Sequence, residues 1–264
     1  MARRICVPEL SADAPRDARV RIATGLRLHV VEWGAADGWP VVILHGGAHD
    51  AARWAEVCRR LPPELRCIVP DQRGHGGSDR APDGDYSCAA QVKDLVALLD
   101  ALGVDRCALV GHSMGGLNAL RFAGSWPGRV TALVLVDVST ETRSTGLEAI
   151  RRSRERADAP PDPAAPPPGF DLRLLDFVPS YGGDADERRR LLAASRAPLL
   201  VMRGARSRIL SAELARRCAR RGKGEVVEIP DAGHNVSQHN PEAVAAALLR
   251  FLAPLVLDEV RGEG

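Results

Sequence analysis

The sequence of 264 residues predicts an α/β fold built on a mainly parallel sheet. Short apolar runs alternate along the chain with stretches of helical periodicity, which is typical of βαβ units. Most of these runs also lack the alternation of a half-exposed strand, as expected for strands buried on both faces of a parallel sheet. With 45% hydrophobic residues, a chain of this length can form one domain with a large core, with or without a small insertion.

The first predicted strands form a hairpin, because Val20–Ala23 and Leu26–Val31 flank a Thr24-Gly25 turn. Next comes Val41–Leu44, a continuous apolar run that fits a strand buried on both faces. Further strands of this kind are predicted at Cys67–Val69, Cys107–Val110, Ala132–Val136, Leu199–Met202 and Val226–Ile229.

Helical patterns lie between the predicted strands. One covers Ala89–Leu102 and ends at Gly103, a residue suited to the C-cap because it has no Cβ. Another covers Pro241–Leu252, where proline stands at an early helical position and Asn240 is the expected N-cap.

Residues 139–197 interrupt this alternation, because they contain no run typical of a core strand. They hold a charged helical stretch (Leu147–Ala157), a proline-rich segment (Ala159–Gly169) and a further short helical pattern. Proline cannot take part in a central strand ladder. We therefore predict a core of residues 1–138 and 198–264, with 139–197 as a cap insertion over one edge of the sheet. The alternative, a disordered linker between two domains, would leave too few strands for a second core.

The composition is ordinary for a soluble globular protein, with 27% charged residues and a formal net charge of +2. This balance gives no reason to expect nucleic acid or an acidic membrane as a partner. No run approaches the roughly 18 apolar residues of a membrane span, and no apolar segment follows the N-terminal arginines as in a secretory leader. We therefore expect a cytoplasmic protein. Its six cysteines lack CxxC spacing and are predicted to be free thiols, although their even count permits disulfides.

The most specific motif is Gly111-His112-Ser113-Met114-Gly115, between the predicted strand Cys107–Val110 and a helical pattern at Leu117–Ala123. This is G-x-S-x-G in the context that it requires, namely a strand, a tight turn and a helix. The glycines permit the turn, and the helix N-terminus offers unpaired N–H groups. We predict that Ser113 is a nucleophile.

A serine nucleophile needs a base within hydrogen-bonding reach. Among the seven histidines, His234 follows a predicted strand and a turn at residues 230–233, which leaves it at the strand's C-terminal end. Ligand sites of open α/β sheets form along that edge, and the histidine comes last in chain order in enzymes with this elbow. His234 is therefore the predicted base, and His239 is the competing candidate.

Two adjacent glycines follow the strand Val41–Leu44, in the segment His45-Gly46-Gly47. Adjacent glycines let backbone N–H groups face a developing oxyanion. The N–H of Gly47 and that of Met114, the residue after the nucleophile, are predicted to form an oxyanion hole. A simple turn is the alternative.

Four motifs appear in order along the chain: His45-Gly46-Gly47 with Trp54 downstream, the segment Asp71–Asp79, Gly111–Gly115, and Asp231-Ala232-Gly233-His234. Together they resemble the α/β-hydrolase superfamily, in its esterase, lactonase and carbon–carbon hydrolase branch. The resemblance covers nearly the whole chain apart from its N-terminal end and the insertion. It implies a Ser–Asp–His triad, an eight-stranded sheet flanked by helices, and a cap over the active site.

The acid that orients the histidine has two candidates. In many members of this family it stands in a Gly-x-x-Asp turn before the histidine strand, but here the turn Arg203–Ser207 has serine at that position. This departure resembles the subgroup whose acid follows the sixth strand, where Asp137 ends the run Ala132–Val136. Asp137 is the predicted acid, and Asp231 is the alternative. A helix cap or a solvated loop is the structural alternative for Asp137.

The resemblance implies a serine hydrolase that cleaves an ester, lactone or thioester of a small substrate through an acyl-enzyme. Ser113 excludes the haloalkane dehalogenases and epoxide hydrolases of this fold, which carry aspartate at the elbow. One rival is a cyclase, lyase or cofactor-free oxygenase with His234 as its base, and another is a non-catalytic ligand-binding module. We expect no metal or organic cofactor, a small molecule as the partner, and a monomer or a homodimer.

Specificity in this fold comes from the insertion and the loops above the elbow. The substrate pocket is expected to include His45 and Ala48 beside the elbow, with Phe170, Leu174 and Tyr181 as an apolar wall from the insertion. The side chains of the insertion could equally form its own small core, and the sequence leaves both interpretations open.

Overall fold

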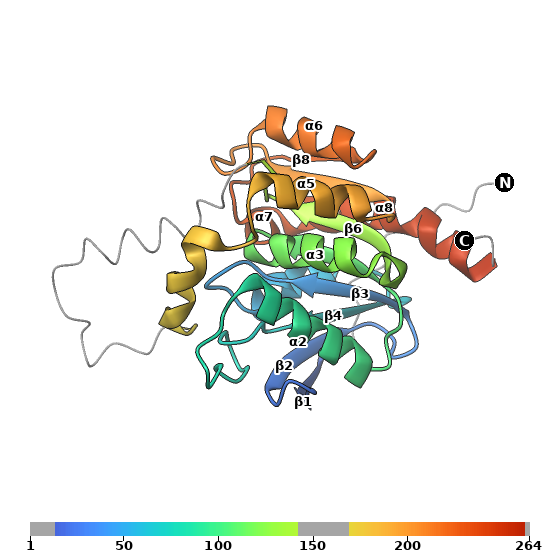
Figure 1. Cartoon of the computed structure of the whole chain (residues 1–264). Coiled ribbons are helices and arrows are strands. Elements are labelled where there is room, and N and C mark those ends of the chain that lie inside the picture. The colour runs from blue at the N-terminus through green and yellow to red at the C-terminus, as the bar shows by residue number, and fades with distance from the viewer. Residues whose placement is uncertain (1–13, 142–168, 262–264) are drawn as a thin grey trace.

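The computed structural model describes residues 14–141 and 169–261, so the predicted helix Leu147–Ala157 and most of the proline-rich segment lie outside the described residues. Eight strands form one sheet in the order β1-β2-β4-β3-β5-β6-β7-β8 (Figure 1). The strands are β1 (Arg16–Arg21), β2 (Arg27–Trp33), β3 (Trp39–Leu44), β4 (Leu65–Pro70), β5 (Cys107–His112), β6 (Val130–Val136), β7 (Leu199–Gly204) and β8 (Glu225–Ile229).

The sheet is mostly parallel. β1 and β2 form an antiparallel hairpin at one edge, β2 pairs antiparallel with β4, and the remaining neighbours are parallel. The predicted eight-stranded α/β sheet is therefore confirmed, together with its N-terminal hairpin. Because parallel strands end at the same edge, the loops after β3, β5, β6 and β8 meet there.

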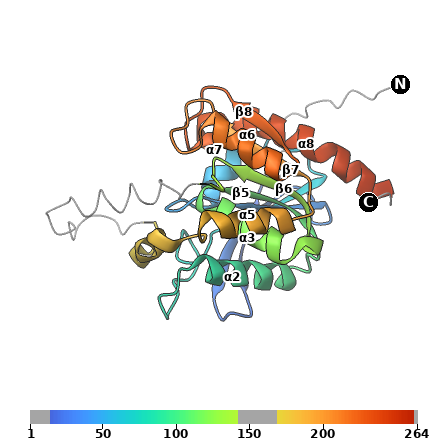
Figure 2. The ribbon, with the colours of Figure 1, turned by 45° about the horizontal axis from the view of Figure 1, so that its top comes forward.

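Helices cover both faces of the sheet. In Figure 1, α2, α3 and α5 lie in front of the strands, and Figure 2 shows α8 on the far side of the strands from α3. The first core contains side chains from α2 (Cys88–Ala101), α3 (Met114–Ser125), α5 (Ala185–Ala194) and α6 (Ala212–Arg221). The second contains side chains from η1 (Ala51–Trp54), α1 (Ala55–Cys58), α7 (Val236–His239) and α8 (Pro241–Arg261).

Neighbouring residues of a central strand belong to opposite cores. In β6, Leu133 and Leu135 lie in the first core, and Val134 and Val136 lie in the second. Side chains of a strand alternate between the faces of a sheet, so both sets must be apolar when both faces are covered. This is the physical reason for the continuous apolar runs in the sequence.

The ends of two helices follow the predicted capping residues. Gly103, with φ +64°, comes directly after the C-cap of α2, and the Asn240 side chain accepts a hydrogen bond from the Ala243 N–H (3.0 Å) at the start of α8. The prediction that α8 ends at Leu252 is wrong, because the helix continues through Pro254 to Arg261. Proline removes one hydrogen bond there, and side chains beyond it still pack against the second core.

The described part of the predicted insertion lies against two different regions. Phe170 forms an isolated antiparallel β-bridge with His75, and the 3₁₀ helix η3 (Leu172–Ser180) follows it. α5 then packs along α3, where a Cβ on Gly124 would lie 2.6 Å from the Leu191 carbonyl oxygen. α5 therefore lies in the helix layer of the core, although its residues fall inside the range 139–197.

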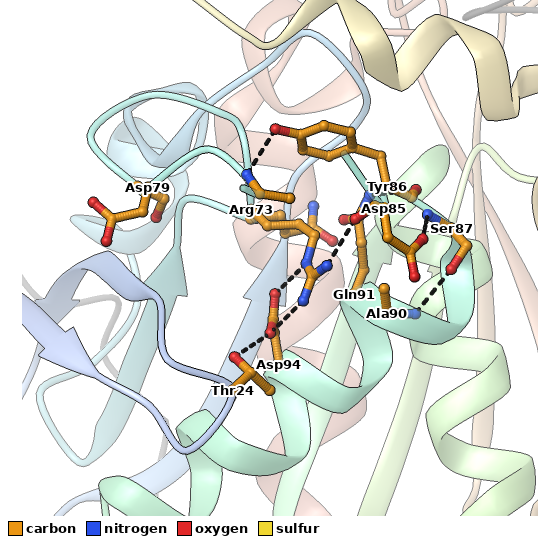
Figure 3. A network of polar contacts seen from close by, with 12 residues as sticks. Thr24, Arg73, Asp79, Asp85, Tyr86, Ser87, Ala90, Gln91 and Asp94 are labelled. Carbon is orange, nitrogen blue, oxygen red and sulfur yellow. Dashed lines mark hydrogen bonds and ion pairs between the residues drawn. The ribbon is translucent and has the colours of Figure 1, made fainter. Parts of the chain in front are cut away.

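A buried ion pair joins three segments on the α2 side of the sheet (Figure 3). The Arg73 guanidinium donates to both carboxylate oxygens of Asp94 on α2, at 2.5 Å and 2.7 Å, and to the Asp85 carbonyl at 2.7 Å. The Thr24 hydroxyl, from the hairpin turn, donates to Asp94 at 2.7 Å. Arg73 and Asp94 are both buried, so each charge depends on the other for compensation.

Candidate active site

Ser113 stands in the sharp turn between β5 and α3. Its backbone has φ +52° and ψ −113°, an uncommon conformation for a residue with a side chain. A Cβ on Gly111 would lie 2.4 Å from the Gly115 carbonyl oxygen, and a Cβ on Gly115 would lie 2.4 Å from the Leu44 carbonyl oxygen. The two glycines are thus required for the close approach of strand, turn and helix, and the strained conformation presents Ser113 at the end of β5.

Asp137 directly follows β6, the neighbour of β5. The two strands pair in register, with His112 opposite Val136, and the Ser113 N–H donates to the Val136 carbonyl at 3.0 Å. Asp137 is fully buried and has φ +48°, and its N–H donates to the Met202 carbonyl at 2.8 Å. Ser113 and Asp137 therefore follow adjacent strand ends at one edge of the sheet.

His234 lies on the loop after β8, and its ring contacts residues at the ends of β5 and β6. Its Nδ1 is 2.7 Å from Oδ2 of Asp137. The ring centroid lies 4.6 Å from that of His112, whose Nε2–H donates to the His234 carbonyl at 2.8 Å. The structure thus brings His234, Asp137 and the elbow together.

The two competing candidates have other partners. The Asp231 carboxylate is largely exposed and lies 3.1 Å from the Arg206 guanidinium. The His239 Nδ1 accepts a hydrogen bond from the Gly233 N–H at 2.9 Å. Among the acidic side chains that the structure describes, Asp137 is thus the one hydrogen-bonded to His234.

The loop after β3 lies against the elbow. A Cβ on Gly46 would lie 2.7 Å from Nδ1 of His112, so this glycine is required for the close packing of the two loops. Neither the Gly47 amide nor the Met114 amide donates a hydrogen bond to a described residue. Both predicted donors of the oxyanion hole therefore remain available at the edge where Ser113 lies.

His45 and Ala48, predicted to line the pocket, flank these glycines. His45 is fully buried, and its ring bonds to the Gly46 carbonyl (2.8 Å) and accepts from the Gln72 N–H (2.9 Å). Burial lowers the pKa of His45 to about 4, so its ring is neutral. With both ring nitrogens occupied, His45 supports the loop and has no surface with which to contact a substrate. Ala48 is half-buried, and its N–H donates to Nε2 of His75 at 3.2 Å.

The three predicted wall residues from the insertion are also buried. Phe170 stacks on His75, with ring centroids 5.9 Å apart, and Leu174 packs in the first core. The Tyr181 hydroxyl donates to Oδ1 of Asn118 on α3 at 2.8 Å. Their burial agrees with the packing alternative, and a role in the substrate pocket stays a prediction.

Sequence reasoning missed two sets of contacts. The Ser207 hydroxyl donates to Oδ2 of Asp137 at 2.6 Å. On the other side of the site, the His49 ring lies parallel to the His112 ring, with centroids 5.7 Å apart. Burial, followed by the charge of Arg53, lowers the pKa of His49 to about 4. The sequence did show that Ser207 stands where many family members carry the acid. No motif or spacing in the sequence indicated that His49 and His112 would stack.

Three further properties of the described residues concern metal ligands, membrane-spanning helices and cysteines. Within residues 14–141 and 169–261, no group of three or more His, Cys, Asp or Glu side chains is placed to hold a metal ion. No helix in the same ranges combines the length and the apolar character that a membrane crossing needs. The free, buried cysteines are Cys58, Cys67, Cys88, Cys107 and Cys218.

Comparison with known proteins gives matches over most of the chain. The sequence model of the α/β hydrolase fold family matches residues 40–163. The acetyltransferase component of the acetoin cleaving system of Pseudomonas putida is 30% identical, over 90% of this chain and 69% of its own. A Bacillus subtilis protein, provisionally named 2-succinyl-6-hydroxy-2,4-cyclohexadiene-1-carboxylate synthase, is 36% identical over 63% of this chain and 55% of its own.

Solved structures agree with these matches. A thermophilic esterase from Thermogutta terrifontis superposes with a TM-score of 0.73 at 28% identity, over 91% of this chain and 99% of the esterase. For several curated relatives, the match to this chain spans only 33–55% of the relative's own length.

Proposed function

The chain belongs to the α/β-hydrolase family, and we propose that it is a serine hydrolase that cleaves a carboxylic ester-type bond of a small substrate. The observation that carries the proposal is the hydrogen bond of 2.7 Å between His234 and Asp137, beside the strained elbow of Ser113. A buried carboxylate that orients a histidine next to a serine is the arrangement that activates a hydroxyl nucleophile.

Asp137 fixes which nitrogen of His234 carries the proton. The carboxylate accepts from Nδ1–H, so Nε2 of the neutral ring is unprotonated and free to act as a base. As Ser113 Oγ attacks the substrate carbonyl, Nε2 takes the hydroxyl proton, and the imidazolium is stabilised by the Asp137 charge. The same proton then passes to the leaving group, which departs as an alcohol or a thiol.

The oxyanion is assigned to the amides of Gly47 and Met114. Each lacks an acceptor among the described residues, and each belongs to a loop held by close glycine contacts. Donors already aimed at the developing charge need no reorganisation during the reaction. Water then attacks the acyl-enzyme, with His234 again as the base, which releases the acid and restores Ser113.

The pocket wall is proposed to include Ala48 and Phe170. Ala48 follows the oxyanion loop, and its amide is held by His75, on which the Phe170 ring stacks. These two side chains are apolar, and we propose that they contact a short acyl group. Ester, lactone and thioester substrates all present the same reacting carbonyl. The proposed mechanism requires only one copy of the chain, so both a monomer and a homodimer are compatible with it.

The proposal is tested by hydrolysis of p-nitrophenyl acetate and butyrate. Ser113→Ala should remove nearly all turnover, and Asp137→Asn should lower kcat by about 10³-fold or more, because the histidine then adopts the wrong tautomer. Ser125→Ala, at the exposed far end of α3, is the matched control and should keep wild-type activity. Full activity of Ser113→Ala would reject the serine mechanism.

The second candidate function uses the same site without hydrolysis. It is favoured by the relative from Bacillus subtilis, which is named as a synthase. In that case His234 would act as a base on a bound substrate. Ser113→Ala would then keep much of the activity on the natural substrate, whereas His234→Ala would lose it. A non-catalytic module would instead bind its ligand stoichiometrically, without turnover.

A further inference from the structure

The turn after β7 contacts the carboxylate of Asp137 at both oxygens. The Gly204 N–H donates to Oδ1 at 3.2 Å, and the Ser207 hydroxyl donates to Oδ2 at 2.6 Å. Oδ2 is also the oxygen that lies 2.7 Å from Nδ1 of His234. Ser207 and His234 therefore share one carboxylate oxygen.

The direction of the Ser207 hydroxyl proton is fixed by its other contacts. The oxygen accepts hydrogen bonds from the Ile209 N–H (3.1 Å) and the Leu210 N–H (3.3 Å). These two donors occupy the acceptor side of the hydroxyl, which leaves its single proton for Asp137. The hydrogen bond is charge-assisted and short, and therefore of the stronger kind.

The turn itself is bound to the histidine loop. The Ala205 N–H donates to the Ile229 carbonyl at 2.9 Å, and the Arg206 N–H donates to the Ala232 carbonyl at 2.8 Å. The Arg203 Nε–H donates to the Leu210 carbonyl at 3.0 Å. The backbone around Ser207 is thus held between the end of β6 and the loop that carries His234.

We propose that Ser207 is a positioning residue for Asp137. This inference rests on the proposed serine hydrolase function. Without the Ser207 hydroxyl, Oδ2 would lose one of its two donors, and rotation of the carboxylate about its χ2 bond would be restrained only by the Gly204 N–H and by His234. Asp137 has a left-handed backbone conformation. The direction of its carboxylate is set by the hydrogen bonds to its two oxygens.

The test compares Ser207→Ala with Ser207→Thr, using p-nitrophenyl butyrate. Loss of the hydroxyl should lower kcat by about tenfold with little change in KM, because Asp137 then orients His234 less well. The acid limb of the pH profile should also move to lower pH, since a carboxylate that is less well aligned with Nδ1 stabilises the imidazolium less. Threonine keeps the hydroxyl and should restore both.

A control variant separates this effect from general damage to the loop. Ser211→Ala removes a hydroxyl that caps α6 by accepting from the Leu214 N–H and that makes no contact with Asp137. It should keep wild-type kcat. Equal kcat and pH profiles in Ser207→Ala and the wild type would overturn the positioning role.

Failure of the proposed function has a different signature, because Ser113→Ala would then retain activity whatever stands at position 207.

Discussion

At the scale of single residues, the site depends on unusual backbone conformations and on glycines that let neighbouring backbone segments pack closely. Ser113, Asp137 and Ala48 all have positive φ, and they occupy the elbow after β5, the turn after β6 and the loop after β3. Each such conformation costs of the order of 1–3 kcal/mol for a residue with a side chain. Contacts of the surrounding glycines, such as Gly115 against β3, keep these conformations in place.

Gly115→Ala should therefore destabilise the protein. Its added Cβ would lie 2.4 Å from the Leu44 carbonyl oxygen, which is backbone and cannot turn away. We expect a loss of about 2 kcal/mol in the free energy of unfolding in urea, in line with overpacking of a filled core. Gly128→Ala is the control, because nothing lies within 4 Å of its Cβ position. Equal losses in the two variants would contradict this account of the elbow.

At the scale of elements, α2 is held to the loop after β4 by the Arg73–Asp94 pair (Figure 3). The same helix carries Asp100, whose exposed carboxylate pairs with Arg129 at 2.7 Å. The Asp100–Arg129 pair should stabilise the fold less than the Arg73–Asp94 pair. Water screens the charges of the exposed pair but not those of the buried one. One helix thus supplies both a buried and an exposed ion pair.

Asp94→Ala should destabilise the protein by about 3 kcal/mol, since it leaves a buried guanidinium without its counter-charge. Asp100→Ala should cost less than about 1 kcal/mol. Chemical denaturation of both variants measures the difference. If Asp94→Ala proved as mild as Asp100→Ala, the Arg73–Asp94 pair could not be the contact that holds α2 to the loop after β4.

The elements also show what could be predicted from the sequence. The central strands were predictable because both faces of the sheet are covered, which forces continuous apolar runs such as 132–136. The position of Asp137 followed because it ends one of these runs. The end of α8 was not predictable from Pro254 alone, since packing beyond the proline decides whether the helix continues. The place of Tyr181 depends on its hydrogen bond to Asn118 of α3, which no local pattern encodes.

At the scale of the whole molecule, pH acts on the sheet edge through His29. Its Nδ1 lies 2.7 Å from Asp71 and its Nε2 lies 2.9 Å from Asp17, so the ring joins β2 to β1 and to the loop after β4. Desolvation lowers the pKa of His29, but the hydrogen bonds and charges of Asp17 and Asp71 outweigh it and raise the pKa overall. The protonated ring is therefore favoured in the folded state.

The free energy of unfolding should fall as the pH rises through the raised pKa of His29. The stabilisation is fully present below the unfolded pKa of about 6.5 and is lost above the folded pKa. Urea unfolding between pH 6 and pH 9 measures this in the wild type and in His29→Gln, which cannot titrate. The wild type should lose more stability than the variant over that range. A pH dependence that is identical in the two proteins would contradict the role of His29.

The central claim, that Ser113 is a nucleophile activated by His234 and Asp137, is tested most directly by covalent labelling. A fluorophosphonate reacts with an activated serine and leaves a phosphonyl group whose position mass spectrometry of the peptides identifies. We predict a single adduct on Ser113, formed far more slowly in Asp137→Asn and absent in His234→Ala. An adduct on another residue, or no adduct on the folded wild type, would contradict the account.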